Sequence, residues 1–102
     1  MSKVRLGHLD FALVEMDKIS AAESFGFYAA EAQEIHICKG MERRRSAEVI
    51  IHELLHGIVD FQNLSHILKD NEEPVVRGIA IGLATVIRDN QKLFADLVKA
   101  LK

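Results

Sequence analysis

The sequence has one cysteine, little net charge and no apolar run long enough to span a membrane, and each of these excludes a class of protein. The 102 residues carry a formal net charge of −2, so no basic field indicates nucleic acid as a partner. Cys38 is alone, which excludes an internal disulfide and favours a reducing compartment. We expect it to be a small core residue at a strand end. The most apolar late stretch, residues 78–87, is about half the length of a membrane span, and no signal-like segment begins the chain. We therefore expect a cytoplasmic protein with no membrane partner.

The length fits one domain, residues 1–102, with material for one core. Three segments have the apolar or aromatic alternation of strands: Phe11–Glu15, Phe25–Tyr28 and Glu34–Cys38. We expect residues 29–33 to form a hairpin loop and the polar residues 18–24 to be a connection. The sequence predicts an α+β domain, in which a small N-terminal antiparallel sheet of about three strands precedes three or so helices.

The central feature is an H-E-x-x-H pattern at residues 52–56, inside a predicted helix from about Glu42 to Phe61. His52 and His56 are four residues apart, so their imidazoles lie on one helix face about one turn from each other. That is metal-ligand spacing. Glu53 lies roughly 100° around the helix from His52, where it could accept a proton from a water molecule that the metal activates.

A pattern with three fixed positions also arises by chance, and the alternative is a pair of histidines satisfied by hydrogen bonds. Burial favours a metal, because the pattern falls in the most apolar part of the chain, where an unpaired buried charge costs several kcal/mol. The same helix begins with three arginines, Arg43 to Arg45. We interpret them as a solvated first turn rather than a phosphate site, although cations there oppose the helix dipole.

Two further helices are predicted near the C-terminus. Pro74 suits the first turn of one helix, and residues 64–68 form a short helical turn before it. Gly78 and Gly82, one turn apart, are expected to let the backbone of the histidine helix come close. The last helix, residues 93–101, is amphipathic, and we expect its apolar face to pack on the core rather than on a second copy of the chain.

The third ligand is left open by the residues themselves, since a catalytic zinc ion takes three protein ligands. Asp60 lies about 12 Å along the helix axis from the first histidine and cannot reach the same ion, although it could orient the second histidine. Glu72 and Glu73 stand where the next helix begins, and either could point inward. The proline after Glu73 is expected to hold that residue at the helix edge. His66, in the intervening loop, is a further candidate.

A family resemblance extends over roughly residues 10–100. It is carried by the H-E-x-x-H helix and by Phe25-Gly26-Phe27-Tyr28, Ile35-His36-Ile37, Glu72-Glu73-Pro74-Val75-Val76, Gly82-Leu83 and Arg88-Asp89-Asn90. Together these segments resemble the small H-E-x-x-H proteins encoded by phages and prophages, which are minigluzincin-like zinc metallopeptidases. The resemblance implies His52, His56 and Glu73 as zinc ligands and Glu53 as the general base, although Pro74 departs from the pattern and leaves Glu72 in contention.

The resemblance also implies one metallopeptidase-like domain of gluzincin type that hydrolyses a peptide or protein in a bacterial or phage-infected host cell. We expect a monomer or weak homo-oligomer. Tyr28, His36 and His66 are candidate donors to the peptide oxyanion, and the sheet edge could bind an extended peptide. The alternative is a non-catalytic phage-derived interaction module, either stabilised by zinc or free of metal.

Overall fold

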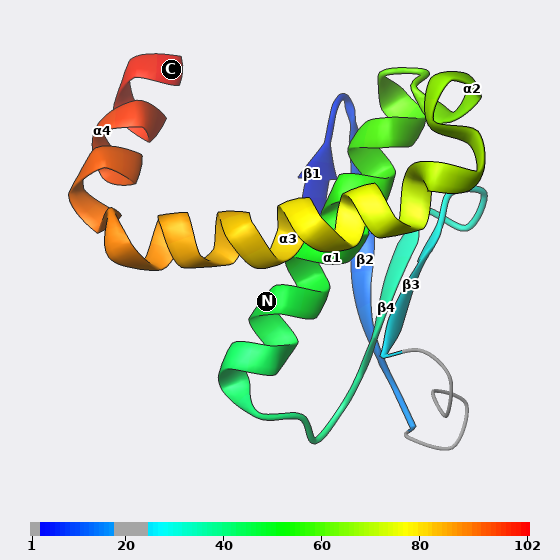
Figure 1. Ribbon diagram of the computed structural model, residues 1–102. Helices are drawn as coiled ribbons and strands as arrows, with labels where there is room; N and C mark the ends of the chain where they lie inside the picture. Colours follow the sequence, from blue (N-terminus) through cyan, green and yellow to red (C-terminus); the bar gives the residue numbers. More distant parts are fainter. Residues whose placement is uncertain (1–2, 18–24) are drawn as a thin grey trace.

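The computed structural model describes residues 3–17 and 25–102, with the strands first and the helices after them (Figure 1). The strands are β1 (Lys3–Leu6), β2 (Leu9–Met16), β3 (Gly26–Ala29) and β4 (Glu34–Cys38). The helical segments are α1 (Arg43–Phe61), α2 (Ser65–Leu68), the 3₁₀ turn η2 (Lys69–Asn71), α3 (Glu72–Asp89) and α4 (Gln91–Leu101). The predicted α+β class is confirmed. The expected connection at residues 18–24 lies outside the described residues.

The strands form a mixed sheet in the order β1-β2-β4-β3. β1 pairs antiparallel with β2, and β3 with β4, as expected for the hairpin around residues 29–33. β2 and β4 run parallel, from Ala12 opposite Glu34 to Met16 opposite Cys38. The sheet therefore has four strands rather than about three, and it is mixed rather than antiparallel. Strand β1 was not predicted. Cys38 is buried at the end of β4, as predicted.

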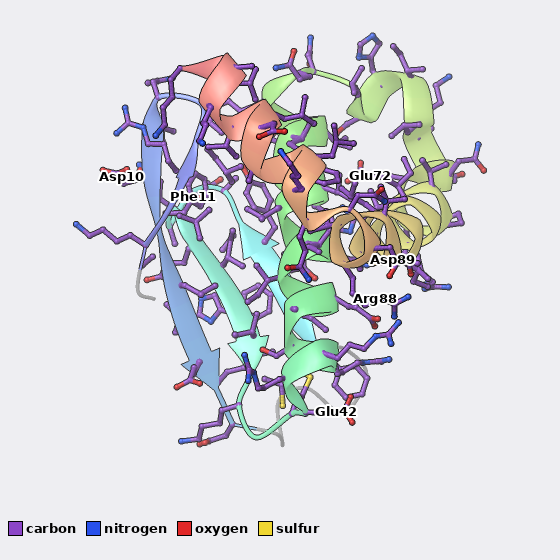
Figure 2. All side chains as sticks on the ribbon, turned by 90° about the vertical axis from the view of Figure 1, so that its left-hand side faces the viewer. Asp10, Phe11, Glu42, Glu72, Arg88 and Asp89 are labelled. Carbon is purple, nitrogen blue, oxygen red and sulfur yellow. The ribbon has the colours of Figure 1, made fainter. Side chains whose placement is uncertain are left out.

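The core lies between the sheet and α1, which crosses one face of the sheet (Figures 1 and 2). Phe11 on β2 and Ile35 on β4 are 1% and 0% exposed, and Leu54 of α1 packs against this cluster. The helix approaches closely at Gly57, where an added Cβ would lie 2.7 Å from Leu6 Cδ1. A glycine at this position lets α1 lie against the sheet.

Helix α3 packs across α1 through Val76 and Ala80, each 2% exposed. Pro74 lies in its first turn, as predicted. The expected close approach at Gly78 and Gly82 is wrong, because a Cβ added at either would meet no atom within 4 Å in the described chain. Each glycine follows a buried residue by two positions, about 200° around the helix, and so faces away from α1.

Helix α4 turns away from the sheet at the end of α3 (Figure 1). None of its residues is buried, and Leu97 and Leu101 are 43% and 85% exposed. The expectation that its apolar face packs on the core is therefore wrong. The 18 residues of α3 extend for about 27 Å, which carries the chain past the sheet before α4 begins. Among the described helices, none is long and apolar enough to cross a membrane.

Candidate metal centre

Helix α1 presents two imidazoles to the first turn of α3. The Nε2 atoms of His52 and His56 lie 3.2 Å apart. The carboxylate of Glu73 completes the cluster, with Oε1 2.9 Å from His56 Nε2 and Oε2 3.1 Å from His52 Nε2. These ligand atoms all lie within 4.8 Å of one another. The structure thus brings the three predicted ligands close enough to hold one metal ion.

The packing of α3 directs Glu73 toward the histidines. Val76 and Ala80, three and seven residues later, are buried against α1, and residues at that spacing share a helix face. Pro74 does not push Glu73 out of the helix, because the first turn needs no backbone N–H from a proline. Glu73 is the second residue of α3, whereas we expected it at the helix edge.

The spacing of the cluster fits a zinc ion. Zinc bonds to nitrogen and oxygen of about 2.0–2.1 Å place two ligand atoms roughly 3.3 Å apart at a tetrahedral angle. The nitrogen and oxygen atoms of His52, His56 and Glu73 are 2.9 to 3.3 Å apart, within a few tenths of an ångström of that value. Two imidazoles with one carboxylate are also the donor set of catalytic zinc sites that keep one position open.

Glu72 orients one of the histidines. Its Oε2 lies 2.7 Å from His56 Nδ1, on the other side of the ring from Glu73. Because a carboxylate only accepts hydrogen bonds, Nδ1 donates its proton to Glu72, so that His56 without a proton on Nε2 would present the Nε2 lone pair to a metal ion. Carboxylates commonly hold metal-binding histidines in this way. The two neighbouring acidic residues therefore have different positions, and Glu73 is the one in the cluster.

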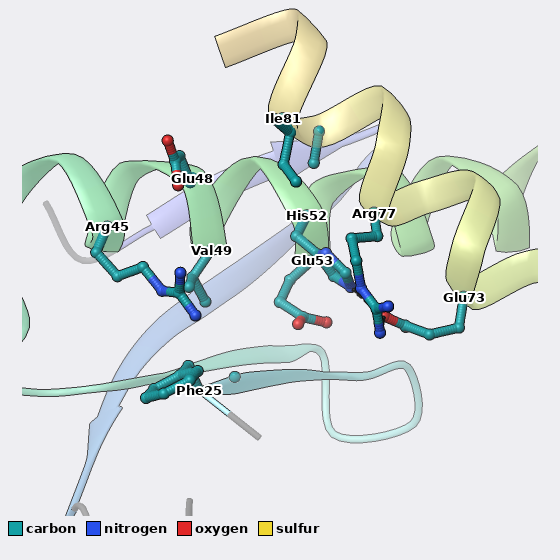
Figure 3. Close-up of a pocket in the computed structure, with 11 residues that line it drawn as sticks. Phe25, Arg45, Glu48, Val49, His52, Glu53, Glu73, Arg77 and Ile81 are labelled. Atoms are coloured by element: carbon teal, nitrogen blue, oxygen red, sulfur yellow. Dashed lines mark hydrogen bonds and ion pairs between the residues drawn. The ribbon is translucent and has the colours of Figure 1, made fainter. Parts of the chain in front are cut away.

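Glu53 is buried next to the cluster. It is 6% exposed, and among the described residues it is the only charged side chain that is buried. Burial raises the pKa of its carboxyl, while the charges of His52 and His56 partly counter that effect. Figure 3 shows the carboxylate pointing from α1 into the cleft beside His52. A carboxyl group of raised pKa at this position suits a general base.

The cluster without metal is a network of charged hydrogen bonds. Burial lowers the pKa of His56, but hydrogen bonds to Glu72 and Glu73 outweigh burial and raise the pKa above its ordinary 6.5. Burial raises the pKa of Glu73, but its contacts with His56 and His52 outweigh that effect and lower the pKa below its ordinary 4.5. The imidazoles and the carboxylate therefore hold one another in place between α1 and α3.

A cleft runs past the cluster between α1, α3 and the sheet edge formed by β3. It consists of two adjoining cavities of about 350 and 640 Å³, and both are lined by His52, Glu53 and Glu73. The end of the cleft toward the start of α1, hereafter the Arg45 end, is lined by Phe25, Arg45, Val49 and Ile81. The Asp60 end is lined by Tyr28, Asp60, Ser65 and Glu72.

Tyr28, one of the three candidate oxyanion donors, lies in the Asp60 end of the cleft. Its hydroxyl donates to Asp60 Oδ2 at 2.9 Å, and burial together with this bond raises the pKa of Tyr28 to about 12. Asp60 therefore binds Tyr28, and the orienting role considered for Asp60 at His56 belongs to Glu72.

The other two candidate donors lie elsewhere. His36 stacks on Phe27 with ring centroids 4.3 Å apart and bonds Glu34, and it does not line the cleft. His66 is exposed on α2, outside the cluster. Arg45, which was interpreted as part of a solvated first turn, lines the cleft; it lies seven positions before His52 and so on the same helix face. That spacing was the available signal.

Comparisons of the chain with protein families, curated proteins and solved structures found no match.

Proposed function

We propose that the chain is a zinc-dependent metallopeptidase, which hydrolyses peptide bonds in a bacterial or phage-infected cell. One observation carries the proposal. His52, His56 and Glu73 place three ligand atoms 2.9 to 3.3 Å apart, and the carboxylate of Glu53 points into the same cleft.

The residues of the cluster divide the chemistry between them. A bound zinc ion supplies a Lewis acid that polarises a carbonyl and makes water more acidic. His52, His56 and Glu73 would hold the ion, and Glu72 keeps His56 in the tautomer that binds it. Glu53 accepts the proton of the attacking water and returns it to the leaving amine.

The cleft suits an extended peptide. β3 is an edge strand, and Phe27 and Tyr28 of this strand line the Asp60 end. An edge strand binds an extended chain through backbone hydrogen bonds. Of the three candidate oxyanion donors, Tyr28 is the one that lines the same cavity as His52 and Glu53, and its hydroxyl would have to exchange its bond to Asp60 for one to the substrate.

A second candidate is a non-catalytic interaction module, with or without zinc. The observation that favours it is the hydrogen-bonded network itself, in which His56 bonds Glu72 at 2.7 Å and Glu73 at 2.9 Å. These contacts already connect α1 to α3, and an ion bound at the same place would stabilise that connection without taking part in catalysis.

Metal content and cleavage together separate the two candidates. Protein purified without added zinc or chelator should contain about one zinc ion per chain, and the His52→Ala variant should contain none. Cleavage of a mixed peptide library is then followed by mass spectrometry. We expect Glu53→Gln to keep its zinc and to lose about 10²- to 10⁴-fold in rate. Zinc binding without cleavage would favour the module, and a wild-type chain that binds no zinc would refute the peptidase.

A further inference from the structure

The Arg45 end of the cleft carries a guanidinium held against an aromatic ring. Arg45 Cζ lies over the Phe25 ring, 4.7 Å from its centroid, and Figure 3 shows Phe25 below the side chains of Arg45 and Val49, which extend from α1. A guanidinium has five N–H donors, and one that lies over an aromatic ring still has N–H groups available to an acceptor. The position of Arg45 at this end of the cleft is therefore suited to an anion such as a carboxylate.

Arg45 differs in its charge balance from Arg44 and Arg77. Arg44 bonds Glu48 at 3.2 Å, and Arg77 bonds Glu73 at 3.4 Å. Among the described residues, no carboxylate lies within ion-pair distance of Arg45.

The surroundings of Arg45 strengthen its field. The first turn of α1 contains no acidic residue, so the helix dipole adds to the charge of the arginine. The acidic side chains that line this end are Glu48, Glu53 and Glu73. Arg44 pairs with Glu48, and Arg77 and the histidines pair with Glu73. The remaining charges at this end of the cleft are the carboxylate of Glu53 beside the cluster and the guanidinium of Arg45 farther away.

Arg45 and the cluster lie on one line along α1. Arg45, Val49 and His52 share a helix face, and the seven residues from Arg45 to His52 correspond to about 10.5 Å of helix axis. An extended peptide covers that distance with about three residues, at roughly 3.3 Å each.

On the basis of the proposed peptidase function, we propose that Arg45 binds a carboxylate of the substrate about three residues from the bond that is cleaved. The substrate class is then a peptide with an acidic residue at that position or with its C-terminal carboxylate there. Arg45 acts as a specificity-determining residue, and Phe25 holds it in place.

Binding to a zinc-loaded Glu53→Gln chain tests the proposal without turnover. Labelled octapeptides of one sequence are compared by fluorescence anisotropy, with one glutamate or one glutamine moved through each position, and with either a free or an amidated C-terminus. We expect glutamate at one fixed position to bind about three- to tenfold tighter than glutamine. If amidation removes the preference instead, the carboxylate is that of the C-terminus.

Three arginine variants assign the effect. Arg45→Gln should abolish the preference for the carboxylate, and Arg45→Lys should retain part of it because the charge remains. Arg43→Gln is the matched control, since it removes the same charge from the same turn but does not line the cleft. Equal effects of the Arg43 and Arg45 variants would indicate a general field and overturn the proposal.

The outcomes distinguish this proposal from the peptidase function. Cleavage by the unmodified chain with no acidic preference would leave the peptidase standing and refute the role of Arg45. A preference that depends on Arg45, without cleavage, would support the site and refute the peptidase. Neither binding nor cleavage of any peptide would refute both.

Discussion

The two acidic residues at the start of α3 provide the sharpest test of the site. Glu73 contributes an oxygen 2.9 Å from His56 Nε2, whereas Glu72 bonds the opposite nitrogen of the same ring. Glu72→Ala and Glu73→Ala each remove one carboxylate from the first turn of α3. Their effects on the helix dipole are therefore matched, about 0.3–1 kcal/mol each, and the difference between them reports the metal site.

The magnitude follows from the role of each carboxylate. Zinc sites with four ligands bind with about 10–16 kcal/mol, so one ligand accounts for about 2.5–4 kcal/mol, or roughly 10²- to 10³-fold in affinity. Glu73→Ala should therefore bind zinc roughly 10²- to 10³-fold more weakly than the unmodified chain. Loss of a residue that orients a ligand costs about 10- to 100-fold. We expect Glu72→Ala to lose about tenfold, because the Glu72 side chain is 26% exposed and water can replace its hydrogen bond.

The assay is competition for zinc against a chromophoric chelator, with cobalt(II) absorption as a second measurement. The cobalt spectrum reports the coordination sphere, so it should change in Glu73→Ala and be retained in Glu72→Ala. Glu48→Ala is the control, since Glu48 lines the same cleft but bonds Arg44, and its zinc affinity should be unchanged. An affinity loss in Glu72→Ala that equals or exceeds that in Glu73→Ala would refute the assignment.

Three further predictions concern the scaffold. Val76→Ala should lower the free energy of unfolding, measured by urea denaturation, by about 2 kcal/mol. Val86→Ala, at a position 46% exposed, should change it by less than about 0.5 kcal/mol. Equal losses in the two variants would contradict the packing of α3. Gly78→Ala should raise the free energy of unfolding by about 0.5–1 kcal/mol, because the new Cβ meets open space. Gly57→Ala should lower the free energy of unfolding, because its Cβ would lie 2.7 Å from a packed side chain. The opposite signs would show that the helices are oriented differently. A chain ending at Asn90 should keep its zinc affinity, since no residue of α4 is buried; lost affinity in a folded truncated chain would show that α4 supports the site.

The local features of the chain were predictable because they depend on neighbouring residues. Apolar spacing without breakers marks α1, and the four-residue interval between His52 and His56 places both imidazoles on one face in any α-helix. Strand alternation marked β3 and β4 for the same reason. The position of Glu53 beside His52 also follows from the pattern, and the structure buries that carboxylate next to the histidines.

Contacts between distant segments decided the rest. The parallel pairing of β2 with β4, the outward direction of α4 and the orientation of Gly78 depend on how the elements pack, which local spacing does not encode. The choice between Glu72 and Glu73 also depended on packing, because adjacent residues on a helix differ by about 100° in direction. Only the burial of the α3 face that includes Val76 against α1 determined which carboxylate meets the Nε2 atoms of both histidines. The sequence by itself thus determined the relative positions of His52, Glu53 and His56, because they depend only on helix spacing, whereas the packing of α3 on α1 brought Glu73 to the two imidazoles and formed the cleft.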